Sequence, residues 1–296
     1  MYTVTDFTLG VLIPVLVAVV VLSAGAMLEL RWRAWATPLA IAAAFIAGYP
    51  LIANAAPSLP PRTAADWLFW LALPIGLLAA FDAALRPPAP ARLLIAAGTL
   101  VVTLFLMLRP AALSGAIVNP LLLATILGGV LLVEWWFADR AVADDPTPTA
   151  YFGLICILAG ASVVVMLSDS QKYASHAGAA VAGGGAVLGL LLLGLHPHRV
   201  VLHGASLALV AIVGAIFVVS LESVLVNVKL HNALLIAAAP PLLWASKFIH
   251  QPAKPWLAAV VRLSLPAAPV LIALAIAGFK VYQDLHGGSG EYNPWE

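Results

Sequence analysis

The sequence predicts an all-α integral membrane protein, a polytopic bundle of about ten transmembrane helices joined by short loops. Of its 296 residues, 63% are hydrophobic and only 9% are charged, whereas soluble domains are about 45–50% apolar and about 25% charged. Long apolar stretches recur along the chain, and many are close to the roughly 20 residues that a helix needs to cross a bilayer. Ten such spans would place about 200 residues in lipid and leave no sizeable soluble domain.

Ten apolar windows define the expected spans. They cover residues 8–29, 36–56, 66–85, 93–108, 116–137, 150–168, 177–195, 201–220, 230–248 and 263–282. The first window is expected to be a retained helix and not a secretory signal, because Asp6 is the only charged residue before it and a signal needs a positive start. Residues 221–232 fit either a helix extension or a loop at the interface.

The distribution of Lys and Arg predicts the orientation. With the N-terminus outside, nine of these residues fall in segments expected inside and five in segments expected outside. Cytoplasmic segments carry the excess of positive charge. We therefore expect a multi-pass protein of a bacterial-type cytoplasmic membrane with both termini outside.

The chain is expected to form a single transmembrane domain, 1–296. The loop at 138–149 divides it into two possible halves, 1–138 and 150–285, with five spans each. An odd number of spans inverts the second half, as in inverted-repeat transporters. The Gly-rich, polar segment 286–296 is expected to be a flexible tail.

Small residues on the seventh window predict close helix packing. Gly185 and Gly189 form a small-xxx-small pair, and Ala179 with Gly183 continues the pattern. Such a surface lets another backbone approach closely. It indicates either a contact inside the bundle or a face for a second copy or a partner in a membrane complex.

Ionisable residues near lipid each need a partner or a task, because they are costly there. Glu29 with Arg33, and Asp82 with Arg86, have the i,i+4 spacing of helical ion pairs. Glu134 has no basic residue within a turn, and Arg262 is similarly isolated. We expect Glu134 and Arg262 to meet between the fifth and tenth spans, or else to extend separately to the headgroups.

The densest polar patch lies near the predicted outer side. Its ionisable and amide residues are Glu222, Asn227, Lys229, His231 and Asn232. On a helix, Asn227 and His231 would form one stripe with Ser220 and Ser223. This pattern indicates either a solute or proton path or a turn whose polar groups meet water.

A proline pair and a group of histidines also bear on function. The pair Pro240–Pro241 is expected to break the ninth span beside Trp244, and broken helices at mid-membrane are where transporters place ligands. His196, His198 and His203 are weak metal-ligand candidates, since no cysteine or carboxylate lies near them. Asp144 and Asp145 are expected to form a solvated turn.

Several function classes are disfavoured. The net charge is +1 with no basic cluster, which excludes nucleic-acid binding. The single cysteine, Cys156, can form neither an intrachain disulfide nor a cysteine metal site. No phosphate-binding Gly-rich loop, GxSxG or HExxH motif is present, which favours a non-catalytic protein without a cofactor.

Two functions remain as hypotheses. The first is a transporter or channel for a small solute, with a polar cavity lined by Glu134, Asn227, His231 or Trp244. The second is a non-catalytic structural or accessory subunit of a larger membrane complex. The lipid bilayer is the expected surrounding in both.

Overall fold

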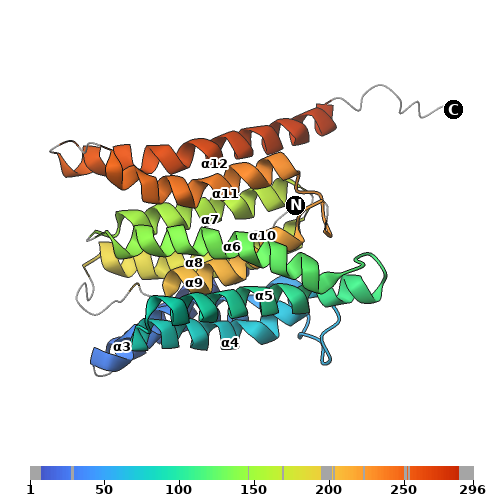
Figure 1. Cartoon of the computed structure of the whole chain (residues 1–296), viewed down its shortest axis with the longest axis horizontal. Helices are drawn as coiled ribbons and strands as arrows, with labels where there is room; N and C mark the ends of the chain where they lie inside the picture. Colours follow the sequence, from blue (N-terminus) through green and yellow to red (C-terminus); the bar gives the residue numbers. More distant parts are fainter. Residues whose placement is uncertain are drawn as a thin grey trace.

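The computed structural model is a helical bundle (Figure 1). It describes residues 8–27, 30–145, 147–168, 170–194, 202, 204–222, 224–249, 252 and 254–286. The π-helices are η1 (Thr8–Leu12) and η2 (Val210–Gly214), the 3₁₀ helix is η3 (Ser246–Phe248), and the α-helices are α2 (Ile13–Ala26), α3 (Leu30–Ala53), α4 (Ala64–Leu85), α5 (Ala89–Leu113), α6 (Pro120–Ala143), α7 (Thr149–Leu167), α8 (Gln171–Leu192), α9 (Ala205–Leu209), α10 (Ala215–Val219), α11 (Leu230–Ala245) and α12 (Pro255–His286). Within these residues there is no β-strand.

Each of the ten predicted windows overlaps a helical segment in the described part of the chain. Seven of the described helices, α3 to α8 and α12, are long and apolar enough to cross a bilayer. The other three windows coincide with shorter segments, namely η1 with α2, the run α9–η2–α10, and α11. The tail predicted to be flexible lies outside the described residues after His286, where α12 ends.

The long helices alternate in direction, so their connecting turns gather at two ends of the bundle (Figure 1). The predicted inner end is the one that the charge count places in the cytoplasm, and it is where α4 ends and α5 begins, where α6 ends and α7 begins, and where η3 ends and α12 begins. The predicted outer end holds the connections at 54–63 and 114–119 and the described residues 224–229.

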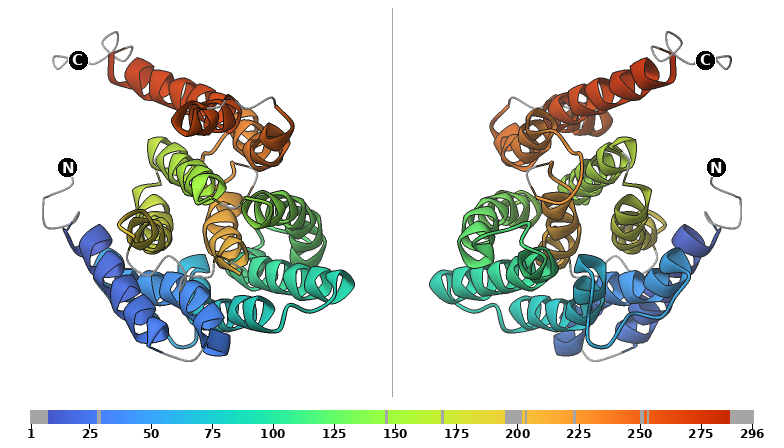
Figure 2. Two further views of the ribbon diagram at one scale, coloured as in Figure 1. Left: turned by 90° about the vertical axis from the view of Figure 1, so that its left-hand side faces the viewer. Right: turned by 90° about the vertical axis from the view of Figure 1, so that its right-hand side faces the viewer.

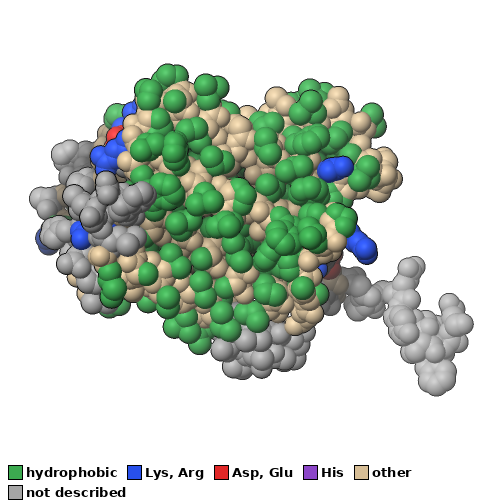
Figure 3. Space-filling model, turned by 90° about the horizontal axis from the view of Figure 1, so that it is seen from below, with side chains coloured by type: hydrophobic (Ala, Val, Ile, Leu, Met, Phe, Trp, Pro, Cys, Tyr) green, Lys and Arg blue, Asp and Glu red, His purple; other side chains and the backbone are tan. Residues whose placement is uncertain are grey.

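Between the two ends, the outer surface of the bundle is apolar. Leu73, Leu77 and Phe81 of α4 and Leu94 and Val102 of α5 are exposed. Figure 3 shows hydrophobic side chains covering the middle of one face, with Lys and Arg toward its ends. This is the surface that a membrane-embedded bundle presents to lipid.

The run α9–η2–α10 is the central helix of the bundle (Figure 2). Every residue of Ala205–Val219 is buried, and α3, α4, α5, α6, α7 and α8 all pack against it. A helix that is hydrophobic on all sides belongs in such a position. Gly204 precedes it with a φ of +77°, and a Cβ there would lie 2.2 Å from the carbonyl oxygen of Ala79, so only glycine fits.

The helices α8 and α3 approach each other closely. A Cβ added at Gly183 would lie 2.7 Å from Cβ of Ala44, and one added at Gly48 would lie 2.8 Å from Cβ of Ala179. Cβ atoms added at Gly185 and Gly189 would meet no atom of the described residues within 4 Å. The pair Ala179–Gly183 therefore packs inside the bundle, whereas no described residue packs closely on Gly185 or Gly189.

The predicted break in the ninth span needs correction, and the structure decides between the alternatives for residues near 221–229. Pro240 and Pro241 lie within α11, which continues through both and ends at Ala245, so the predicted break is absent there. Of the alternatives open for the polar patch, the described residues 221, 222 and 224–229 form a turn, in which a bridge joins Leu221 to Val228. The helical stripe is therefore not formed in this part of the chain, and Ser223 lies outside the described residues.

We predict that Gly183→Val lowers the free energy of unfolding by about 1–3 kcal/mol, because the added atoms overpack the contact with α3. Denaturant titration in detergent micelles would measure this. Gly185→Val is the control, since its side chain enters open space on the same helix. Equal losses for the two variants would contradict the close approach of α8 to α3.

Candidate functional site: a cavity at one end and buried charges at the other

A cavity of about 890 Å³ lies between η1, α3, α7 and α8. Its size falls within the usual range for small-molecule sites, about 300–1,000 Å³. The body of the cavity is apolar, with Leu51 from α3, Val163 and Met166 from α7, and Val181 from α8 on its wall. Ser162 also lines it, but its hydroxyl donates to the carbonyl of Leu158.

Polar residues line the cavity at the predicted outer end. Asn54 follows the last residue of α3, while Gln171, Lys172 and Ser175 belong to the first turns of α8. None of the residues on its wall is Asp or Glu. Among the described residues Lys172 is in no ion pair. The cavity therefore has an apolar body and a polar, cationic end formed by these four residues, which we call its mouth.

Asp66 fixes the loop between α3 and α4 at the same end. Its carboxylate accepts hydrogen bonds from the hydroxyl of Tyr49 at 2.6 Å, the hydroxyl of Ser58 at 2.8 Å and the backbone N–H of Thr63 at 3.1 Å. Thr63 accepts in return from the N–H of Asp66, so the two close a capping box at the start of α4.

The ring of His176 stacks on Tyr49, with centroids 4.7 Å apart. His176 is only 1% exposed, and neither ring nitrogen has a hydrogen-bond partner in the described part of the chain. Sequence reasoning missed both this histidine and Asp66. The Thr-x-x-Asp spacing of the capping box could have identified Asp66, and a lone ionisable residue beside an apolar window could have identified His176.

At the predicted inner end, Arg92 of α5 lies between two buried aspartates. Its Nε and Nη2 donate to both oxygens of Asp82 on α4, at 2.8 and 3.0 Å, and Nη2 also donates to Asp139 on α6 at 3.0 Å. The hydroxyl of Ser206, on the central helix, donates to the other oxygen of Asp139 at 2.9 Å. The i,i+4 pair expected between Asp82 and Arg86 is wrong: α4 ends at Leu85, and Arg86 is in the left-handed conformation.

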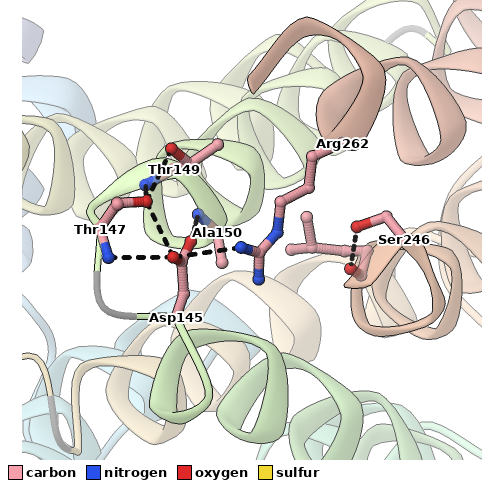
Figure 4. A network of polar contacts seen from close by, with 7 residues as sticks. Asp145, Thr147, Thr149, Ala150, Ser246 and Arg262 are labelled. Atoms are coloured by element: carbon pink, nitrogen blue, oxygen red, sulfur yellow. Dashed lines mark hydrogen bonds and ion pairs between the residues drawn. The ribbon is translucent and has the colours of Figure 1, made fainter. Parts of the chain in front are cut away.

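A second cluster at this end joins the turn after α6 to α7 and α12 (Figure 4). Arg262 Nη1 lies 3.1 Å from Asp145 Oδ1, and both side chains are almost fully buried. Asp145 also accepts from the N–H and hydroxyl of Thr147 and from the N–H of Ala150, at 2.7 to 2.9 Å. Asp145 is thus a buried carboxylate bonded to the first turn of α7, so its expected place in a solvated turn is wrong.

Arg262 therefore pairs with Asp145 and not with Glu134, which corrects the predicted contact. Glu134 is half-buried on α6, and its Oε2 has no partner among the described residues. The neighbour of Asp145, Asp144, pairs with Lys247 at 2.7 Å. The ammonium of Lys247 also lies 4.6 Å from the ring centre of Trp244, so Trp244 belongs to the same end.

The predicted outer patch is a turn at the surface. Glu222 and Lys229 form an ion pair, and Asn227 and His231 are exposed. None of these four residues, nor Glu134 or Trp244, is on the wall of the cavity. His196, His198, His203 and Glu29 lie outside the described residues, and within the described ones no three His, Cys, Asp or Glu residues are placed to hold a metal ion.

Comparison with known proteins finds no matching family model, no similar curated protein and no similar solved structure.

We predict that Arg92→Gln lowers the free energy of unfolding by about 3–5 kcal/mol, because it leaves two buried carboxylates without their cation. Arg140→Gln is the matched control at the same end. Arg140 is exposed and stacks on Trp136 at 4.6 Å, so its loss is expected to cost about 1 kcal/mol or less. Denaturant titration in detergent compares the two, and similar small losses would contradict a structural role for the buried cluster.

Proposed function

We propose that this chain is a ten-span membrane transporter for a small solute, with its binding site in the cavity between η1, α3, α7 and α8. The cavity is the observation that carries the proposal. It has the volume of a ligand site, it is bounded by helices from separate parts of the chain, and its polar residues lie at one end of the bundle. In the proposed topology the three shorter segments also cross the bilayer, and both termini lie outside in a bacterial-type cytoplasmic membrane.

The ion pairs at the predicted inner end form the second part of the proposed mechanism. A transporter opens its site to one side of the membrane at a time, as one group of helices moves against another. Asp145–Arg262 and Asp144–Lys247 each join the turn after α6 to the C-terminal helices. In this proposal they hold the inner end closed while the cavity opens to the outer side.

The proposed bending point is η2, in the middle of the central helix. A π-helical turn departs from the regular i→i−4 ladder, and such turns are frequent at functional sites. Because α9–η2–α10 packs against α3 to α8, a bend there would change the relative positions of these helices. Glu134 and Trp244 remain proposed path residues near the inner closure. Glu222, Asn227, Lys229 and His231 remain proposed path residues on the outer side.

A specific observation favours a second candidate, an accessory subunit of a larger membrane complex. Within the part of the chain that the structure describes, Cβ atoms at Gly185 and Gly189 would meet no atom within 4 Å, so this face of α8 is available to another backbone. In that case Gly185→Leu would reduce the yield of a chemically crosslinked dimer or complex in membranes.

Transport is tested by cysteine accessibility in a Cys156→Ala background. One reporter is Val163→Cys on the cavity wall, and the other is Ala208→Cys on the buried central helix. We predict that Arg262→Gln, which opens the inner end, increases severalfold the labelling of Ala208→Cys by a membrane-impermeant maleimide added from the inner side. The same variant should decrease the labelling of Val163→Cys from the outer side.

Arg140→Gln serves as the control and should change neither labelling rate. If Arg262→Gln increased the labelling of both reporters, the whole bundle would have loosened. If it increased the labelling of Ala208→Cys and left that of Val163→Cys unchanged, the two ends of the bundle would not be coupled. Either result would contradict alternating access.

A further inference from the structure

We propose, on the basis of the transport function proposed above, that the cavity binds an anionic amphiphile with one alkyl chain and a singly charged head. The head lies at Lys172 and the chain lies along the apolar wall. This assigns the cavity a ligand class through three features, namely the charge at its mouth, the polarity of its wall and its volume.

Charge is the first feature. Lys172 lies in the first turn of α8, it lines the cavity, and it is in no ion pair among the described residues. The N-terminus of a long helix adds a partial positive charge at the same place. With no carboxylate on the cavity wall, this mouth attracts an anion and repels a cation.

The polarity of the wall is the second feature. Leu51, Val163, Met166 and Val181 present only carbon and sulfur to the cavity, and the hydroxyl of Ser162 is already bonded to a backbone carbonyl. A sugar or an amino acid would leave its own polar groups without partners in such a body, which is costly. An alkyl chain has no polar group to satisfy.

Volume and position are the third feature. About 890 Å³ is the space of one drug-sized ligand, which favours a free single-chain amphiphile over a two-chain phospholipid. Asn54, at the end of α3, lies on the mouth of the same cavity as Lys172. Its amide can donate to a carboxylate or phosphate oxygen that the ammonium neutralises.

The test measures the binding of radiolabelled laurate to the full chain in nanodiscs of zwitterionic lipid. We expect saturable binding of one laurate per chain. Lys172→Gln should weaken it about tenfold or more, the effect of losing one charge-assisted hydrogen bond. Gly178→Leu should abolish it, because a Cβ at Gly178 meets no atom of the described residues within 4 Å and the leucine would extend into the cavity that this glycine lines.

Matched controls separate local effects from general ones. Lys280→Gln removes an exposed lysine of α12, and Gly278→Leu places the same side chain in open space on that helix. Both should bind laurate normally. Dodecyltrimethylammonium, which carries the opposite charge, should not displace laurate.

Three results would overturn the inference. Laurate binding that is unchanged in Lys172→Gln would contradict the placement of an anionic head at Lys172. Binding that is unchanged in Gly178→Leu would contradict the cavity as the binding site. Displacement of laurate by phosphatidylglycerol added to the nanodiscs would identify a two-chain lipid as the occupant. These results are independent of the cysteine labelling: Lys172-dependent binding without coupled labelling overturns transport alone, and coupled labelling without Lys172-dependent binding overturns the ligand class alone.

Discussion

Ser206 donates a hydrogen bond to Asp139, Asp139 shares Arg92 with Asp82, and through this chain of contacts the central helix is tied to α4, α5 and α6. Each charged side chain in this cluster needs the others, because all of them lie where water is scarce. Without the guanidinium, two carboxylates would face each other where water is scarce, and without the aspartates, the guanidinium would have no counter-charge. The cluster therefore sets the relative positions of four helices at one end, and the apolar contacts along the bundle follow from those positions.

The positions of the helices could be predicted from the sequence, because each depends on a local run of apolar residues. All ten windows overlap helical segments in the described part of the chain. The polar partnerships could not be predicted in the same way. Asp139 and Arg92 are 47 residues apart, and nothing in the spacing of either residue distinguishes that contact from the i,i+4 pair expected for Asp82.

The same limit explains why the cavity was missed. Its wall combines η1, α3, α7 and α8, and each of these segments alone reads as an ordinary apolar window. Glu222 and Lys229 stand out in the sequence as part of a dense polar patch, but they are paired at the surface. Lys172 does not stand out, because a lysine between two spans is common and only the neighbouring helices place it on a cavity. The glycines of α8 show the same dependence, since Gly183 and Gly185 are two residues apart but only one of them contacts α3.

The complete burial of Ala205–Val219 also constrains how the protein is assembled. Chains are made from the N-terminus, so α3 to α8, which surround this segment, are synthesised before it. A helix on the rim of a bundle can be added to a finished surface, but this one occupies the middle. The helices made first must therefore remain apart, or separate again, until residues 205–219 have entered among them.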